Sequence, residues 1–128
     1  MMHRKEIRVY YEDTDMAGIV YYANYLRYIE RARSDWVREM GIDQLAMKEN
    51  GIVFAVRRVE ADYVTPARFD DILEVRTTLD SLSAAKMVMA QEVWRADELI
   101  FTAKVLIVCI GTAGKPVRLP AECRLLTG

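Results

Sequence analysis

Histidine is almost absent from this chain of 128 residues, which contains a single one, His3, close to its start. Cysteine is scarce as well: Cys109 and Cys123 provide no disulfide framework, and Cys109 lies in an apolar segment. Zinc sites and Ser-His-Asp triads therefore lack the residues that they normally need. We expect no metal site, and the cysteine content favours a reducing, cytoplasmic compartment.

Long apolar runs and an excess of one charge are also missing. No run approaches the roughly 18–20 apolar residues that cross a bilayer. The first residues, MMHRKEIRV, lack the apolar stretch and cleavage site of a secretory signal. The net charge is -1, which argues against general attraction to nucleic acid or anionic membranes. We therefore expect no membrane span and no nucleic-acid partner.

What the chain does contain is typical of a folded domain. Hydrophobic residues make up 52% and charged residues 29% of the sequence, and the length suffices for one hydrophobic core. No internal repeat or linker interrupts it. We expect a single domain over residues 1–128.

One long amphipathic helix is predicted from about Tyr22 to Met40. Apolar side chains recur there at helical spacing, and Gly41 is a natural stop. The residues of this apolar face are Tyr22, Tyr25, Leu26, Ile29, Ala32, Trp36, Val37 and Met40. A short second helix is predicted over residues 44–48.

The remaining segments follow the two-residue period of strands. Alternation predicts strands at 7–11, 53–64, 71–79 and 86–95, and the nearly all-apolar segment 99–110 predicts a strand buried on both faces. Short links between consecutive strands favour antiparallel pairing. The prediction is an α+β fold with one helix on an antiparallel sheet of five strands. One helix cannot cover both sheet faces, so we also expect self-association.

The loop at residues 12–18 joins the first strand to the long helix and carries two aspartates. A loop at a helix N-terminus can combine a carboxylate with free backbone N–H groups. Asp13 is expected to brace the loop. From the residues alone, Asp15 could either cap a turn or supply a reactive carboxylate.

Residues 9–33, VYYEDTDMAGIVYYANYLRYIERAR, resemble the signature of hotdog-fold acyl-CoA thioesterases of the 4-hydroxybenzoyl-CoA thioesterase class. Within that class, the chain is most similar to the Tol–Pal-associated acyl-CoA thioesterases. Residues 59–71, VEADYVTPARFDD, and residues 114–120, GKPVRLP, resemble the same family. The likeness implies a five-stranded antiparallel sheet wrapped around one central helix, in homodimers or homotetramers with active sites at the dimer interface. It also implies hydrolysis of acyl-CoA without a cofactor, since coenzyme A is part of the substrate.

The resemblance assigns roles to three positions around the loop. Asp15 matches the catalytic carboxylate, acting as base or nucleophile, and Tyr11 matches a tyrosine found near the site, although a strand tyrosine can also simply pack. Many members of the subgroup have histidine where this chain has Tyr22. A backbone N–H survives that change, so we expect the amides of Tyr22 and Ala23 to bind the thioester carbonyl oxygen.

Binding of coenzyme A needs cations for its phosphates. The candidates are Arg57, Arg58, Arg68 and Lys86, each of which could instead be a solvated strand residue. Met87 and Met89 could line an acyl pocket or pack in the core.

Two alternatives to hydrolysis stay open. A non-hydrolytic acyl-CoA-binding hotdog protein would share the pocket but release no thiol. A hotdog dehydratase normally uses a histidine with an acidic residue, and this chain has no histidine in its predicted core, so that activity is disfavoured.

Overall fold

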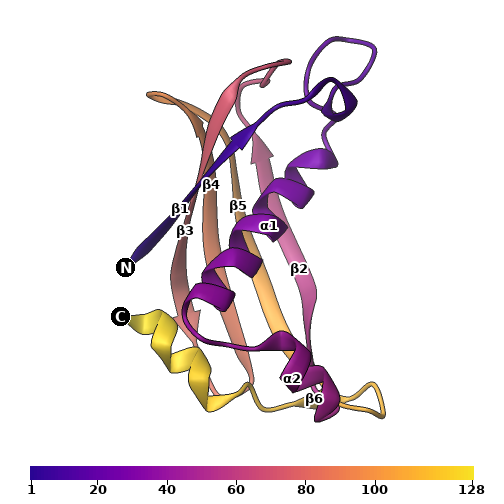
Figure 1. Cartoon of the computed structure of the whole chain (residues 1–128), viewed down its shortest axis with the longest axis vertical. Coiled ribbons are helices and arrows are strands. Elements are labelled where there is room, and N and C mark those ends of the chain that lie inside the picture. The colour runs from indigo at the N-terminus through magenta and orange to yellow at the C-terminus, as the bar shows by residue number, and fades with distance from the viewer.

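The computed structural model describes all residues from Met1 to Gly128, and it shows one antiparallel sheet with a long helix lying across it (Figure 1). The strands are β1 (Met2–Arg8), β2 (Val53–Tyr63), β3 (Ile72–Leu82), β4 (Lys86–Arg95), β5 (Glu98–Ile110) and the short β6 (Pro116–Val117). Their order is β1-β3-β4-β5-β2, and β6 pairs with β5. The predicted α+β fold is confirmed, with the two-residue β6 added to five long strands.

The long helix, α1 (Asn24–Glu39), packs its apolar face onto the sheet. Its C-terminus is closed as predicted, because Gly41 adopts a φ of 85° and the amide of Ile42 donates to the carbonyl of Val37 at 3.1 Å. Two residues of the predicted apolar face, Leu26 and Tyr22, are instead exposed. The residues of α1 that are buried are Asn24, Tyr25, Tyr28, Ile29, Ala32, Trp36 and Val37.

Three short helical segments complete the chain: η1 (Tyr11–Asp13), α2 (Gln44–Glu49) and η2 (Ala121–Thr127). The predicted second helix is therefore confirmed. The predicted first strand at 7–11 is misplaced, because β1 ends at Arg8 and Tyr11 belongs to η1. The reason is local: the Asp13 carboxylate accepts a hydrogen bond from the amide of Tyr10 at 2.8 Å, which turns the chain.

Strand β5 lies inside the sheet between β4 and β2. Its inward side chains, including Phe101, Val105 and Cys109, are buried against the helix side. On the opposite face Lys104 is exposed and Leu106 is only half-buried. One chain leaves this second face without a covering layer, so burial of the strand on both faces, which was expected to need self-association, stays a prediction.

Strand β2 forms one edge of the sheet and pairs only with β5. Its register shifts between Val56 and Arg58, so Arg57 is the extra residue of a β-bulge. Val56 and Val59 are 47% and 38% exposed along this strand. An exposed apolar edge strand is a ready surface for pairing with another chain.

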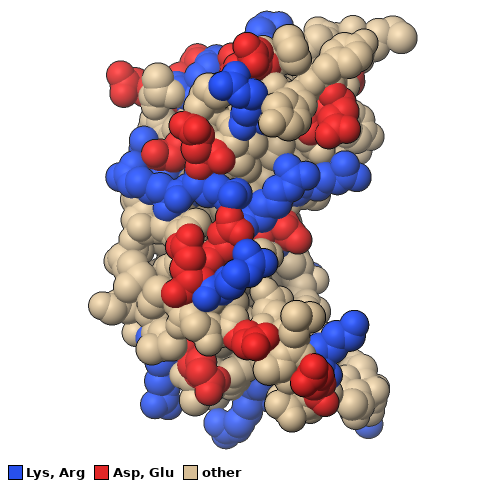
Figure 2. All heavy atoms as spheres, in the orientation of Figure 1, with Lys and Arg blue, Asp and Glu red and all other residues tan.

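The surface around α1 carries charges of both signs. Lysine and arginine side chains alternate with aspartate and glutamate over the face shown in Figure 2. This mixture agrees with the net charge of -1. None of the helices is both long enough and apolar enough to cross a membrane.

Candidate active site

Asp13 holds the loop between η1 and α1. Its carboxylate is buried and accepts hydrogen bonds from the Tyr10 amide at 2.8 Å and from the Asn24 side-chain amide at 2.9 Å. Its carbonyl accepts from the amide of Tyr21 at 2.9 Å. Burial is the main cause of the raised pKa of the Tyr28 hydroxyl, and the neighbouring Asp13 carboxylate raises it further. Asp13 therefore braces the loop, as expected.

Asp15 lies beyond this brace, in a tight exposed turn. One carboxylate oxygen accepts from the amide of Ala17 at 2.9 Å, and the carbonyl of Asp15 accepts from the amide of Gly18 at 2.9 Å. Gly18 has a φ of 79°, a conformation that other residues rarely adopt. The turn fixes Asp15 through a single carboxylate oxygen, and the second oxygen has no partner in the chain.

The start of α1 offers unpaired backbone donors beside this loop. The N-cap position, Ala23, has no side-chain cap, and the amide of Asn24 donates to the carbonyl of Tyr21 at 2.8 Å. The amides of Tyr22 and Ala23 donate to no group in the chain. Free N–H groups at a helix N-terminus, together with the helix dipole, favour negative charge at this point.

Asp15 and Tyr22 line one pocket of about 300 Å³. The other lining residues are mostly apolar and come from the loop, from α1 and from the end of β2: Ile19, Val20, Tyr25, Tyr63, Val64, Thr65 and Pro66. A carboxylate and the start of a helix therefore meet in a largely apolar cavity. A largely apolar pocket with a few converging polar groups is typical of a site for a small ligand.

The wall formed by residues 63–68 was not predicted from the sequence. The Tyr25 hydroxyl accepts from the amide of Ala67 at 3.1 Å, and burial raises the pKa of this hydroxyl. The hydroxyl of Tyr63 donates to the carbonyl of Tyr22 at 3.0 Å, which joins the wall to the helix start. Only the family likeness of residues 59–71 pointed to this segment, because its approach to α1 is a tertiary contact.

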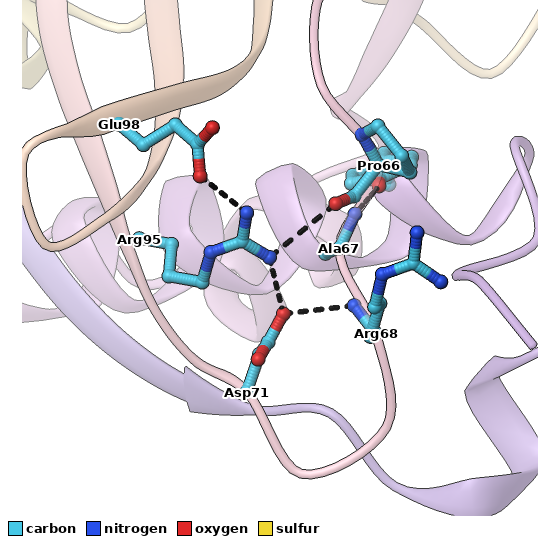
Figure 3. Close-up of polar contacts among 7 residues, drawn as sticks. Pro66, Ala67, Arg68, Asp71, Arg95 and Glu98 are labelled. Carbon is cyan, nitrogen blue, oxygen red and sulfur yellow. Dashed lines mark hydrogen bonds and ion pairs between the residues drawn. The ribbon is translucent and has the colours of Figure 1, made fainter.

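Arg95, the last residue of β4, forms hydrogen bonds to this wall (Figure 3). Arg95 donates to the carboxylate of Asp71 at 2.6 Å and to the carbonyl of Pro66 at 3.3 Å, and it also pairs with Glu98. The Asp71 carboxylate accepts in turn from the amide of Arg68 at 2.8 Å. Hydrogen bonds to Glu98 and Asp71 raise the pKa of Arg95. These contacts give the wall a fixed position.

The remaining predicted residues lie at different distances from the pocket. Arg68 is near, because its backbone pairs with Ile19, and its side chain points away from Asp71 (Figure 3). Tyr11 is 81% exposed, packs edge-on against Phe69 with ring centroids 6.5 Å apart, and does not line the pocket.

Three predicted cations lie further along the sheet. Arg57 and Arg58 sit at the bulge of β2, where Arg58 pairs with Glu60. Lys86 begins β4 opposite Val108, whereas the pocket residue Tyr63 lies opposite Phe101. At the rise per residue of a strand, Val108 and Phe101 on β5 are roughly 23 Å apart, so Lys86 lies far from the pocket. No group of three or more His, Cys, Asp or Glu side chains could hold a metal ion.

An antiparallel sheet wrapped against one long helix is the arrangement of the hotdog class of proteins. The chain belongs to the thioesterase-like superfamily, whose sequence profile matches residues 9–125. It is 39% identical over 121 residues to the acyl-CoA thioester hydrolase YbgC of Escherichia coli, covering 93% of this chain and 90% of that protein.

Solved structures show the same fold. A probable thioesterase from Bartonella henselae superposes with a TM-score of 0.89 at 36% identity, and the match covers 94% of this chain and 100% of that chain. A mutant 4-hydroxybenzoyl-CoA thioesterase in complex with 4-hydroxybenzoyl-CoA superposes with a TM-score of 0.90 at 24% identity, covering 98% of each chain, which is a likeness of fold. The resemblance to hotdog thioesterases is confirmed, and an association with the Tol–Pal system stays a prediction.

Proposed function

We propose that this protein is an acyl-CoA thioesterase, which hydrolyses an acyl-CoA thioester to the free acid and coenzyme A. The observation that carries the proposal is the pocket that Asp15 shares with Tyr22, whose backbone amide is free, at the start of α1. The hydrolase YbgC named above supports the same substrate class. The chain acts as one catalytic domain over residues 1–128 and needs neither a metal nor a cofactor.

The reaction begins with the thioester carbonyl directed at the amides of Tyr22 and Ala23. These N–H groups and the dipole of α1 stabilise the negative charge that develops on the carbonyl oxygen. If Asp15 attacks the carbonyl carbon, the thioester C–S bond breaks and water then hydrolyses the acyl-Asp15 anhydride to release the free acid and restore the carboxylate. If Asp15 acts as a base, it takes a proton from a water that attacks the carbonyl carbon, and the free acid forms directly. The thiolate of coenzyme A then leaves without a dedicated acid. No imidazole takes part, so tyrosine at position 22 is compatible with the chemistry.

Coenzyme A is bound by cations outside the pocket. Arg68 lies beside the pocket wall, and Arg57, Arg58 and Lys86 lie further along the sheet. We propose that a second copy of the chain brings these three cations towards the first copy's pocket. Tyr11 contributes at most a contact near the loop, because it does not line the pocket.

The enzyme works as a homodimer, or as a homotetramer of two dimers, in the cytoplasm. The unpaired edge of β2, with Val56 and Val59 exposed, supports the dimer. The half-covered outer face of the sheet, which includes Leu106, supports pairing of dimers.

A panel of aliphatic and aromatic acyl-CoA thioesters, assayed for release of free thiol, tests this function. We expect at least one thioester to be hydrolysed with a rate proportional to enzyme concentration. Tight binding of acyl-CoA without thiol release would contradict hydrolysis. That result would favour the non-hydrolytic binding protein, in which the turn at Asp15 would be purely structural.

A further inference from the structure

A second cavity lies between α1 and β2, apart from the Asp15 pocket. It has a volume of about 220 Å³, and its floor is formed by Met87, Met89 and Ile107. The other lining residues are Glu30, Arg33, Ser34, Val37, Gln44, Phe54, Ala55 and Val56. Met87 and Met89 are therefore buried in the core and also line this cavity. We call this space the α1–β2 groove.

Arg33 is a poorly paired cation in this groove. One of its terminal N–H groups donates to the side-chain oxygen of Gln91 at 2.9 Å, and Gln91 donates to Thr77 at 3.0 Å and to the carbonyl of Ile29 at 2.9 Å. The partner of Arg33 is therefore a neutral amide, and no carboxylate lies within ion-pair distance. Burial lowers the pKa of the guanidinium, and the charge of Glu30 opposes that shift in part.

A half-buried cation without an ion-pair partner is unfavourable, and a guanidinium has five N–H donors in a fork that matches a carboxylate. Only one of these donors is used in the chain. Glu30 also lines the groove, one turn before Arg33, but forms no ion pair with it. An apolar space beside an incompletely paired guanidinium is suited to an apolar chain that ends in a carboxylate.

The unpaired edge of β2 relates this groove to the Asp15 pocket. Phe54 and Ala55 line the groove, whereas Tyr63 and Val64 line the pocket at the other end of the strand. Antiparallel pairing of β2 with its copy, centred on Val59 and with the bulge at Arg57 counted, sets Phe54 of one chain opposite Tyr63 of the other. The groove of one chain then continues the pocket of its partner.

We propose that Arg33 determines substrate specificity by binding the far end of the acyl group, so that the enzyme prefers acyl-CoA thioesters whose acyl chain ends in a carboxylate. The proposal rests on the proposed thioesterase function and on the dimer. It identifies the occupant of the groove by charge and shape: methionines and Phe54 contact the methylene chain, and Arg33 pairs with the terminal carboxylate.

Two pairs of thioesters matched in carbon number test this inference. Succinyl-CoA is compared with butyryl-CoA, and adipoyl-CoA with hexanoyl-CoA, by kcat/KM from thiol release. In at least one pair we expect the carboxylated substrate to be favoured about tenfold or more, the scale of a charged hydrogen bond. Arg33→Gln should remove that preference while retaining activity on the uncharged partner, and Arg33→Lys should restore part of it. Glu30→Gln should increase it, because a competing negative charge is removed.

Arg31→Gln is the matched control, since Arg31 lies on the same helix, is exposed and does not line the groove. It should leave the preference unchanged. Equal kcat/KM within both pairs, or a preference that survives Arg33→Gln, would overturn the role of Arg33. If no thioester at all is hydrolysed, the proposed function fails instead. Calorimetry with free adipate then decides on Arg33 separately: binding that Arg33→Gln abolishes supports the role, and no binding to the wild type rejects it.

Discussion

Asp13 and Asp15 lie two residues apart in one loop and have opposite surroundings. Asp13 is buried, and both of its carboxylate oxygens accept hydrogen bonds. Asp15 is exposed, uses one oxygen in its turn and faces the pocket. A carboxylate whose lone pairs are occupied stabilises structure, whereas one with a free oxygen at a pocket can act on a substrate.

The first prediction at this scale concerns Asp13→Asn. An amide cannot accept from both the Tyr10 amide and the Asn24 side chain, so one buried donor loses its partner. We expect the free energy of unfolding in urea to fall by about 1–3 kcal/mol. The rate of thiol release should fall less than it does for Asp15→Asn. Asp97→Asn, in an exposed turn without side-chain hydrogen bonds, should change neither quantity. Unchanged stability in Asp13→Asn would contradict the bracing role.

The second prediction concerns Tyr22→Phe. The hydroxyl of Tyr22 has no hydrogen-bond partner in the chain, and the proposed oxyanion donor is its backbone N–H. We expect kcat/KM for thiol release to stay within about twofold of wild type, because phenylalanine retains that amide. A loss of roughly a hundredfold, the scale of removing a catalytic proton donor, would instead assign the chemistry to the hydroxyl.

The sequence predicted the loop at this scale better than the pocket. Two aspartates before a helix start are a local pattern, so Asp13 and Asp15 could be interpreted from spacing. Asn24 gave no such signal, because its bond to Asp13 spans eleven residues. Tyr63 and Tyr25 reach the pocket only through the packing of β2 against α1, which no local pattern encodes.

At the scale of elements, periodicity located the long helix and most strands. Predicted and observed bounds agree for β4, and nearly so for α1, α2 and β2. The first strand was misplaced because alternation from Ile7 to Tyr11 cannot reveal the side-chain bond from Asp13 that ends it. The outer face of β5 is open in a single chain, because apolar composition predicts burial without saying whether this chain or another covers it.

The packing of η2 on the sheet, where it contacts β3, gives a prediction for the cysteines. Cys109 on β5 and Cys123 on η2 are both buried, and burial raises the pKa of each thiol to about 11. At pH 8 the reactive thiolate is therefore only roughly one part in a thousand. We expect a thiol-specific disulfide reagent to leave the native protein unmodified over minutes, and to modify both cysteines in denaturant. Rapid reaction of the folded protein would show that η2 does not stay packed on the sheet.

The assembly is the prediction for the whole molecule. The chain has a mass of 14.8 kDa, and we expect light scattering at micromolar concentration to give at least twice that mass. Val59→Lys places a charge on the exposed edge of β2 and should shift the protein towards the monomer, with loss of thioesterase activity. Leu45→Lys, on α2 and 76% exposed, is the matched control and should leave the mass unchanged. A wild-type monomer that hydrolyses acyl-CoA would contradict an active site shared between two copies.

The catalytic role proposed for Asp15 depends on its loop, on the start of α1 and on the pocket in the assembled protein. Asp15→Asn keeps the shape of the side chain, retains the oxygen that accepts from Ala17 and removes the charge. Thiol release by this variant, compared with wild type on the same acyl-CoA and with folding checked by circular dichroism, is the most direct test. We expect turnover to fall by roughly 10²-fold or more, the scale of losing a positioned base, in a folded protein. Near-wild-type turnover in a folded Asp15→Asn variant would contradict the assignment of Asp15 as the catalytic carboxylate.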